Sequence, residues 1–533
     1  MDWLRRYLPY IPVSRLTCIA LLLCLPAFLI NLGSVAFIGD EGIRTLVALE
    51  MKLSGHYLVP TLNGVGYFNK PPLYNWFIIL MSGLFGHFGE WPTRMTMIIF
   101  LGTFGWTIYF FMRKHVDRLS AISLAFMLIT SGRILFWDSM LGLIDICFSW
   151  IIYLNFMVLY HFGKEGRWKW MFITSYFLCA IAFLLKGLPS VVFQAISMIT
   201  ALVFFRAFRK KFISIDHFLG ALIGLLPMLI YYILYASQVS LKNVFSILWD
   251  QSVQRTGVHY GILKTITHVF AFPFEQTYHF LPWSLLIATF FHPRFRRWLK
   301  QNPFVHFCFW MLIANLPVYW LSVQVYPRYL LMFLPLFNLI GLYILQQSTQ
   351  AGQKWWTIFH YAFTFLSGIV MVMILFMPLN SRVYSINSIF LIWIVASLLM
   401  LICFAGVLLD PKRMFLWVAI TLLMTRSVFS YVILPLRSQD YSENKCREDC
   451  RRLVSDHGDK AWYIFGQTET HEVARYYTAG FKNQIIRKTP VIKDSTAYYL
   501  TDLSLYPDFP GTQIDSLLLE QGQVIALMNV HHQ

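Results

Sequence analysis

Apolar runs recur along the chain and are separated by short polar or charged segments. Most runs have roughly 17–25 residues, which is long enough for a helix to cross a lipid bilayer. The first run follows several arginines and contains no small-residue cleavage site, so we expect a retained helix and not a cleaved signal peptide. The predicted spans cover residues 14–36, 92–112, 117–134, 145–163, 168–185, 188–206, 215–237, 279–292, 303–322, 328–347, 355–377, 385–409 and 413–434. The pattern predicts an α-helical polytopic membrane protein with about thirteen transmembrane helices.

Basic residues set the orientation of these spans, because Lys and Arg are enriched in cytoplasmic loops. With a cytoplasmic N-terminus, every basic cluster falls inside, provided that the short apolar run 73–88 does not cross the membrane. We therefore expect residues 73–88 to form a juxtamembrane helix, with Pro71-Pro72 at its start. The clusters are Arg5/Arg6, Arg113/Lys114/Arg118, Lys164/Arg167/Lys169, Arg206/Arg209/Lys210/Lys211, Arg294/Arg296/Arg297/Lys300, Lys354 and Lys412/Arg413.

This topology divides the chain into a transmembrane domain, residues 1–435, and an extracytoplasmic tail, residues 436–533. A first outer loop, residues 36–91, and a long outer loop, residues 238–278, lie on the same side as the tail. The tail opens with a charged, helix-like run, and short strand-like segments follow it. We predict a small soluble α/β domain there, in the periplasm of a bacterial cell.

Composition agrees with a membrane protein, since 57% of residues are hydrophobic and 13% are charged. Soluble domains carry about 25% charged residues. The net charge of +17 would suggest nucleic-acid binding in a soluble protein. Here the basic residues lie in short loops beside the spans, near anionic lipid headgroups, so we expect a lipid bilayer and no nucleic acid as partner. Cys446 and Cys450 are four residues apart in a predicted helix, which leaves both a disulfide and free thiols open.

Acidic residues stand at the outer ends of two predicted spans. Asp40 and Glu41 directly follow the first span. Such a carboxylate either caps the next helix or acts as a base whose pKa is raised by apolar surroundings. Asp138 and Asp145 lie at the outer end of a later span. Burying a charge at the bilayer centre costs about 2.5–3.5 kcal/mol. An acid at the end of a span therefore needs an oppositely charged partner or a functional role.

Several cations lie on the predicted outer face, although Lys and Arg are usually enriched in cytoplasmic loops. Lys70 follows Tyr67 in YFNKPP, where it suits anion capture, although a lysine that snorkels to the headgroups fits the same position. Lys186, Arg255 and the pair Arg328-Tyr329 lie in other outer segments. One site for a phosphorylated lipid would account for these acids and cations together.

The order of these motifs resembles a known family. Asp-Glu after the first span, YFNKPP, an acid at a later outer loop, LLKGLP and RYLLMFLP follow one another in the chain. They resemble the GT-C fold glycosyltransferases related to the lipid A aminoarabinose transferase and the protein O-mannosyltransferases. The resemblance implies an inverting enzyme that moves a sugar from a polyprenyl-phosphate donor to a glycolipid, glycan or protein. It also implies the outer face of the bacterial cytoplasmic membrane as the place of reaction, and we expect a monomer.

The same resemblance assigns roles to individual residues. Asp40, Glu41 and Asp145 are the candidate catalytic residues, and Asp40 is the candidate base. The candidate ligands of the donor phosphate are Lys70, Arg255, Arg328, Tyr67, Tyr329 and Lys186.

Two residues depart from the family pattern. Relatives often have DExR, but here the tract is DEGIR, so Arg44 is displaced by one residue and rotated by about 100° on a helix. Asn69 stands where many bacterial relatives have Glu before the phosphate-binding lysine. A metal contact through that Glu is lost, so we predict no required metal cofactor.

Other functions fit parts of the pattern. A transporter or flippase for lipid-linked sugars would bury polar groups at the bilayer midplane and often repeat its halves, whereas these charges lie at span ends without a visible repeat. A polysaccharide ligase or polymerase would take a diphosphate-linked glycan. A non-catalytic member that binds a partner through its tail is a further alternative. The sequence leaves the sugar and the acceptor open.

Overall fold

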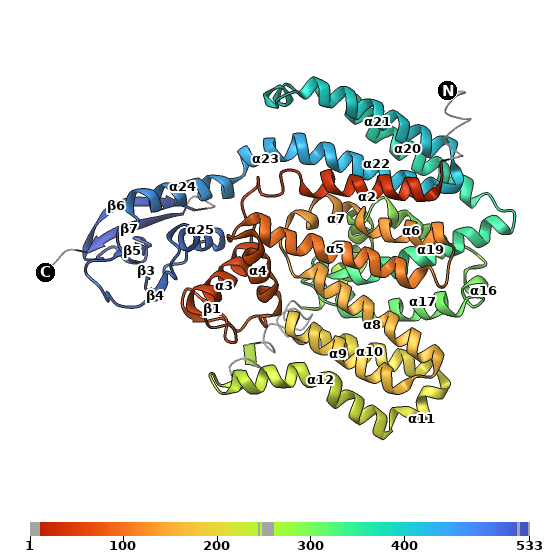
Figure 1. Ribbon diagram of the computed structural model, residues 1–533, viewed down its shortest axis with the longest axis horizontal. Helices are drawn as coiled ribbons and strands as arrows, with labels where there is room; N and C mark the ends of the chain where they lie inside the picture. Colours follow the sequence, from red (N-terminus) through yellow and green to blue (C-terminus); the bar gives the residue numbers. More distant parts are fainter. Residues whose placement is uncertain (1–10, 243–245, 248–260, 520–522, 531–533) are drawn as a thin grey trace.

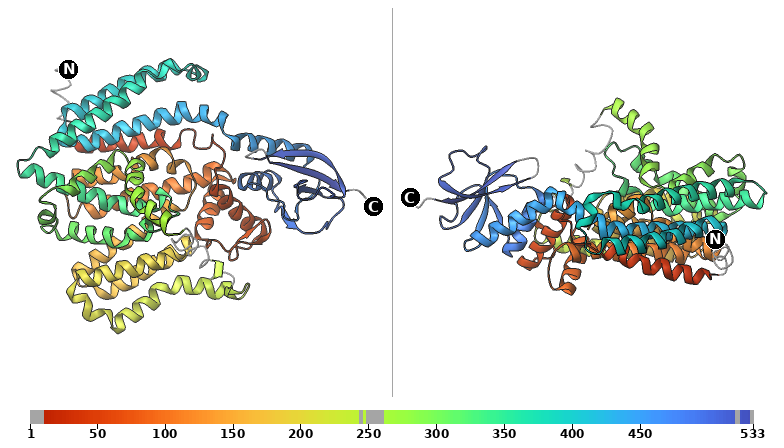
Figure 2. Two further views of the ribbon diagram at one scale, coloured as in Figure 1. Left: turned by 180° about the vertical axis from the view of Figure 1, so that it is seen from behind. Right: turned by 90° about the horizontal axis from the view of Figure 1, so that it is seen from above.

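The computed structural model describes residues 11–242, 246–247, 261–519 and 523–530. Within these ranges the chain is mostly helical, with a small sheet domain at the C-terminal end (Figure 1). The predicted fold class is therefore confirmed: a polytopic helical protein with a C-terminal α/β domain. This sheet domain extends from one end of the helix bundle, beside α3 and α4 (Figures 1 and 2).

Nine helical segments in the described part of the chain are long and apolar enough to cross a membrane, or eleven if each of two bent pairs counts as one span. The single segments are α5 (Glu90–Met112), α8 (Asp145–Glu165), α9 (Trp168–Lys186), α12 (Ile215–Ala236), α17 and α18 (Pro303–Trp320), η5 and α19 (Pro327–Gln350), α20 (Trp355–Leu375), α21 (Ile389–Leu409) and Pro411–Asp440 with α22 and α23. The bent pairs are α6 (Arg118–Ile129) with Gly132–Met140, and α10 (Pro189–Phe204) with Arg206–Phe212.

This count is below the predicted thirteen, and the difference arises at two places. Residues 14–36 form α2 (Val13–Leu29), which has only 17 residues. Residues 279–292 form a short 3₁₀ helix, η4 (Trp283–Phe291), which begins directly after Pro282. Proline lacks the backbone N–H that continues a helix, so α15 (Ile262–His279) ends before it. The predicted outer loop 238–278 is thus partly helical.

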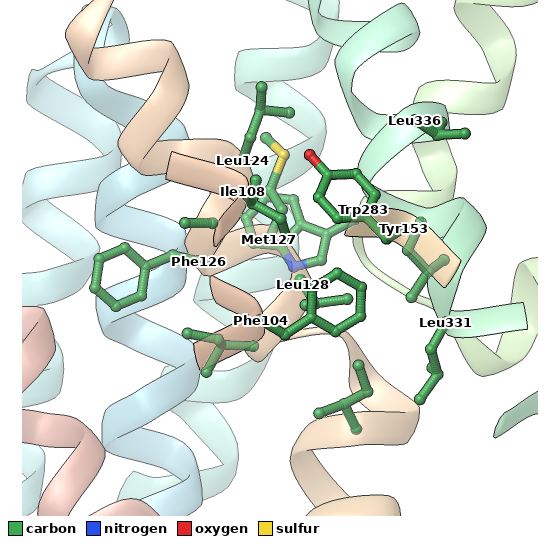
Figure 3. Close-up of a cluster of buried hydrophobic side chains, with 14 of the residues drawn as sticks. Phe104, Ile108, Leu124, Phe126, Met127, Leu128, Tyr153, Trp283, Leu331 and Leu336 are labelled. Atoms are coloured by element: carbon green, nitrogen blue, oxygen red, sulfur yellow. The ribbon is translucent and has the colours of Figure 1, made fainter. Parts of the chain in front are cut away.

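Large apolar side chains fill the interior of the bundle. Figure 3 shows Phe104, Leu128 and Tyr153 gathered around Trp283. The indole Nε1 atom of Trp283 donates a hydrogen bond to Thr130 Oγ1 at 3.1 Å, so the buried N–H is satisfied. The outward sides of α12, α20 and α21 expose large apolar residues, as expected for helices that face lipid.

The segment between α2 and α5 builds a compact layer at one end of the bundle. It contains α3 (Asp40–Ser54), the hairpin β1 (Thr61–Leu62) and β2 (Val65–Gly66), and α4 (Leu73–Phe85). At about 1.5 Å per residue, the 13-residue α4 is too short to cross a hydrocarbon core of about 30 Å. This agrees with the juxtamembrane helix predicted for residues 73–88.

The C-terminal domain combines two helices and a mixed sheet. Helices α24 (Ser442–His457) and α25 (Glu472–Lys482) pack against strands β3 (Trp462–Phe465), β4 (Arg487–Thr489), β5 (Tyr498–Thr501), β6 (Gly511–Leu518) and β7 (Val524–Val530). The strand order is β4-β3-β5-β7-β6, with β3 parallel to both of its neighbours and β7 antiparallel to both of its own. Cys446 and Cys450 are buried on α24 as free thiols, so they form no disulfide here.

Candidate active site

Asp40 is the first residue of α3 and leaves its side chain half-exposed, at 53%. Gly39, with φ of +53°, occupies the N-cap position, so Asp40 does not cap this helix as the alternative interpretation expected. The carboxylate of Asp40 is therefore available at the surface of the bundle end.

Asp145 lies at the centre of a buried ion cluster. Its Oδ1 atom accepts a hydrogen bond from Lys186 Nζ at 2.5 Å, and its Oδ2 atom lies 3.1 Å from Arg328 Nε. The three residues come from the start of α8, the end of α9 and the start of η5 (Pro327–Phe333). The Arg328 guanidinium also reaches Asp40, with 3.6 Å between Nη2 and Oδ2. One acid thus holds two cations in place beside Asp40.

Aromatic rings cover the cations of this cluster. Lys186 Nζ lies 3.7 Å from the centre of the Tyr329 ring, and Arg328 Cζ lies 4.2 Å from the centre of the Tyr326 ring. A cation over an aromatic face is stabilised by the electron density of the ring. The rings therefore orient both cations as well as shield them from water.

Arg44 connects the ion cluster to the loop that carries Lys70. It is buried, and its Nη1 atom donates a hydrogen bond to the Tyr67 hydroxyl at 3.3 Å. Burial lowers the pKa of Arg44, but the charges of Tyr67, Asp40 and Asp145 outweigh this and raise the pKa overall. Three residues beyond Tyr67, Lys70 is half-buried and lines a small pocket together with three tyrosines of α12: Tyr231, Tyr232 and Tyr235.

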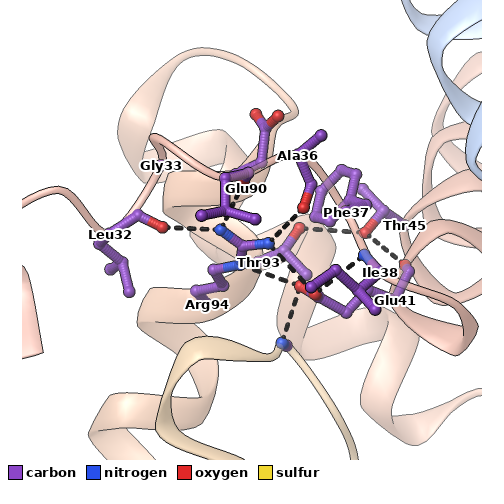
Figure 4. A network of polar contacts seen from close by, with 12 residues as sticks. Leu32, Gly33, Ala36, Phe37, Ile38, Glu41, Thr45, Glu90, Thr93 and Arg94 are labelled. Carbon is purple, nitrogen blue, oxygen red and sulfur yellow. Dashed lines mark hydrogen bonds and ion pairs between the residues drawn. The ribbon is translucent and has the colours of Figure 1, made fainter. Parts of the chain in front are cut away.

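Glu41, the second candidate catalytic residue, lies in a different environment from Asp40. Its side chain is completely buried and accepts two hydrogen bonds from Arg94, at 3.0 and 3.1 Å (Figure 4). The backbone N–H of Gly142 donates a third bond at 3.0 Å. Burial raises the pKa of Glu41, and the bonds from Arg94 offset part of this rise. In this structure no face of the Glu41 carboxylate is open to a substrate.

Arg94 extends this network to the chain before α3. It donates hydrogen bonds to the carbonyl oxygens of Leu32, Val35 and Ala36 at 2.8, 2.8 and 3.0 Å (Figure 4). Together with Glu41 it fixes the turn from which Asp40 projects. The sequence did not single out Arg94, although a basic residue within an apolar span at the outer end is a signal of a buried partner.

The structure brings together most of the predicted site residues. Asp40, Asp145, Lys186, Arg328 and Tyr329 form one cluster, and Tyr67 joins it through Arg44. Lys70 lines the pocket next to Tyr67. Asp138 is not part of the cluster and forms an ion pair with Arg133, at 3.1 Å. Arg255 lies outside the described residues, so its predicted role is untested.

An apolar cavity of about 330 Å³ is lined in part by η5. Its walls include Leu330 and Phe333 of η5 together with Trp320 and Phe272. Leu330 follows Arg328 by two residues in the chain. In the described ranges, no three His, Cys, Asp or Glu side chains gather as a metal site.

Comparison with known proteins gives two kinds of similarity. The sequence model of the dolichyl-phosphate-mannose-protein mannosyltransferase family matches residues 69–231. An uncharacterized protein of Aquifex aeolicus is 24% identical over 316 residues, which are 58% of this chain and 61% of that protein. The chain thus spans less than two thirds of this relative.

The fold is similar to that of a solved structure over nearly its whole length. ArnT from Cupriavidus metallidurans bound to undecaprenyl phosphate aligns with a TM-score of 0.67 at 15% sequence identity, over 98% of this chain and 100% of ArnT. The apo state of the same protein aligns with a TM-score of 0.64. The chain therefore has the ArnT fold, and it resembles the GT-C glycosyltransferases that its motifs indicated.

Proposed function

We propose that the protein transfers a sugar from a polyprenyl-phosphate donor to an acceptor on the non-cytoplasmic face of the membrane. The observation that carries this proposal is the position of Arg328 between Asp40 and Asp145. A half-exposed acid beside a constrained cation suits a reaction in which a proton leaves one group while negative charge collects on another. The match to the mannosyltransferase family and the ArnT fold support the same reaction class.

Each part of the cluster has a task in this reaction. The donor phosphate binds Arg328 and Lys70, while Lys186, buried against Asp145 and the Tyr329 ring, adds its positive charge from behind Asp145. Asp40 accepts the proton of the acceptor nucleophile as that group attacks the anomeric carbon. The bond between this carbon and the phosphate oxygen breaks, and the released polyprenyl phosphate keeps the electron pair. Since the reaction is one displacement, the configuration of the anomeric carbon inverts.

Asp145 acts through its neighbours in this scheme. It is buried and already engaged by Lys186 and Arg328, so it has no free face for a substrate. Its charge holds both cations in one geometry, which reduces the reorganisation needed when phosphate charge develops. Asp145 is therefore a positioning residue, and the base is Asp40.

The apolar cavity beside η5 suits the donor lipid. Its lining comes from helices of the transmembrane region and includes Leu330, which follows Arg328 by two residues in the chain. A prenyl chain bound there would carry its phosphate to the cation cluster. That ArnT was crystallised with undecaprenyl phosphate supports this class of ligand.

The test is a transfer assay with the full-length protein in nanodiscs. Undecaprenyl phosphate carrying radiolabelled mannose or 4-amino-arabinose is supplied with extracted envelope lipids, glycans and proteins, and labelled products are identified by mass spectrometry. We expect product from one donor, and a loss of at least tenfold with Arg328→Ala. Arg382→Ala is the matched control, since Arg382 is an exposed arginine that also pairs with an acid. Label that moves across the bilayer without transfer would instead indicate a flippase.

A further inference from the structure

Arg426 is a buried cation in the transmembrane region. It lies near the end of α22 (Met414–Val428), and its side chain is only 1% exposed. Its Nη1 atom lies 3.5 Å from the sulfur of Met140, and its Cζ atom lies 5.0 Å from the centre of the Phe429 ring. The buried Nε atom has no hydrogen-bond acceptor among the described residues. Neither contact supplies the negative charge that a buried cation normally requires.

The other buried arginines in the described part of the chain are better satisfied. Arg44, Arg94 and Arg413 each donate a hydrogen bond to a side-chain oxygen, and for Arg94 and Arg413 this oxygen belongs to a carboxylate. None of the ion pairs between described residues includes Arg426. Arginine stays protonated in proteins, so its charge persists in this apolar setting.

A small cavity of about 10 Å³ lies beside the Arg426 side chain. Its described walls contain two guanidinium groups, those of Arg426 and Arg94, and no carboxylate. Most of the other walls are apolar, and Leu32 and Ile38 of the turn before α3 are among them. Figure 4 shows this turn around Arg94. Since Arg94 already has a carboxylate partner, the uncompensated charge at the cavity is that of Arg426.

Hydrogen bonds fix the walls of the cavity. The turn that follows α22, η9 (Phe429–Ile433), is π-helical, a geometry that is frequent at functional sites. Asn31, which lines the cavity, donates from Nδ2 to the carbonyl oxygen of Ser430 at 2.9 Å. The Ser430 hydroxyl donates to the carbonyl oxygen of Ala27 at 2.7 Å. The end of α2 is thus joined to the π-helical turn, which holds two sides of the cavity in place.

We propose that this cavity binds one monatomic anion, such as chloride, against the guanidinium of Arg426. A volume of about 10–15 Å³ holds one particle of the size of a water molecule, so a phosphate or sulfate group does not fit. A halide supplies the missing negative charge and needs no directional hydrogen bonds from the apolar walls. A water molecule would fit the same space but would leave the charge of Arg426 uncompensated. The anion takes no part in sugar transfer and stabilises the junction of α22 with the turn before α3.

Thermal unfolding of the full-length protein in detergent tests this inference. Sodium chloride is exchanged for sodium gluconate at constant ionic strength, because gluconate is too large for the cavity. We expect chloride, and likewise bromide, to raise the unfolding temperature by about 2 °C in a saturable manner. Arg426→Met keeps a long side chain without the charge and should abolish this dependence. Arg437→Met is the matched control and should keep it, because Arg437 lies against the same Phe429 ring but is exposed.

A crystal structure of the wild-type protein grown in sodium bromide gives a second measurement that requires no stable variant. We expect one anomalous peak in contact with the Arg426 guanidinium. A missing peak, or density for a water molecule only, overturns the inference. Equal stabilisation by gluconate overturns it as well, as does a chloride dependence that persists in Arg426→Met. Neither readout involves sugar transfer, so the result is independent of the proposed function.

Discussion

The Nη2 atom of Arg328 lies 3.6 Å from the Oδ2 atom of Asp40, although the two residues are far apart in the sequence. The contact joins the proposed base to the proposed phosphate site. When Asp40 is protonated it loses its negative charge, and its attraction for Arg328 weakens. In the same step the leaving phosphate gains negative charge, which Arg328 can then stabilise. Proton transfer and leaving-group stabilisation are therefore linked through one guanidinium.

Replacement of Asp40 by Asn should remove transfer but keep donor binding. The variant retains the size of the side chain and loses the proton acceptor, and loss of a general base costs roughly 10²–10⁴-fold in rate. Single-turnover transfer and undecaprenyl phosphate binding measure the two effects separately. Asp459→Asn, an exposed acid in the C-terminal domain, is the control. Near-normal turnover by Asp40→Asn would rule out the assignment.

Replacement of Lys70 by Ala should weaken undecaprenyl phosphate binding. A hydrogen bond to a charged group contributes about 1.5–3 kcal/mol, which corresponds to roughly 10- to 150-fold in affinity. Calorimetric titration gives the dissociation constant directly. Lys52→Ala, at an exposed lysine near the end of α3, should bind as wild type does. An unchanged affinity in Lys70→Ala would show that Lys70 does not hold the phosphate.

Loss of Asp145 should destabilise the protein through its former partners. Breaking a buried ion pair by removing one member costs about 3–5 kcal/mol, because the other charge stays buried. Asp145→Ala leaves Lys186 and Arg328 without this acid. The double variant Asp145→Ala/Lys186→Met should recover part of the loss, as thermal unfolding in detergent will show. Additive losses from the two single changes would indicate that the pair is not coupled.

A lysine at position 94 should not be able to substitute for arginine in the network around Glu41. The guanidinium makes bonds to two carboxylate oxygens and three carbonyl oxygens, and an ammonium group has only three donors. We expect a lower unfolding temperature and reduced transfer together, since the turn that carries Asp40 loses its support. Arg167→Lys, at an exposed arginine, should change neither. A stable Arg94→Lys protein with full activity would contradict this role.

Gly42→Ala tests the docking of the C-terminal domain. The added methyl group would lie 2.9 Å from the backbone oxygen of Glu472, so α25 must move away. We expect slower single-turnover transfer with unchanged undecaprenyl phosphate binding, because this contact lies two residues beyond Asp40. Gly83→Ala is the control, because a Cβ at Gly83 meets no atom within 4 Å. Equal transfer rates in both variants would mean that the position of α25 does not affect the reaction.

Local features of the sequence determined much of the architecture. The length of the apolar runs gave most of the spanning helices, because the bilayer thickness sets the length of each helix. The positions of the basic residues indicated that residues 73–88 do not span the membrane, and α4 is too short to cross it. Where proline interrupted an apolar run, at Pro282, length alone gave the wrong element.

The site required tertiary contacts that no local pattern contains. The sequence indicated acids and cations at span ends, and the motif named Asp40 as the candidate base. It kept Glu41 among the candidate catalytic residues, because the local sequence does not show where either side chain points. Only the packing of α3 against α5 turned Glu41 inward to Arg94 and left Asp40 half-exposed. The contact of α25 with Gly42 likewise depends on how two separate domains dock, which is decided by the complementarity of their surfaces and not by either segment alone.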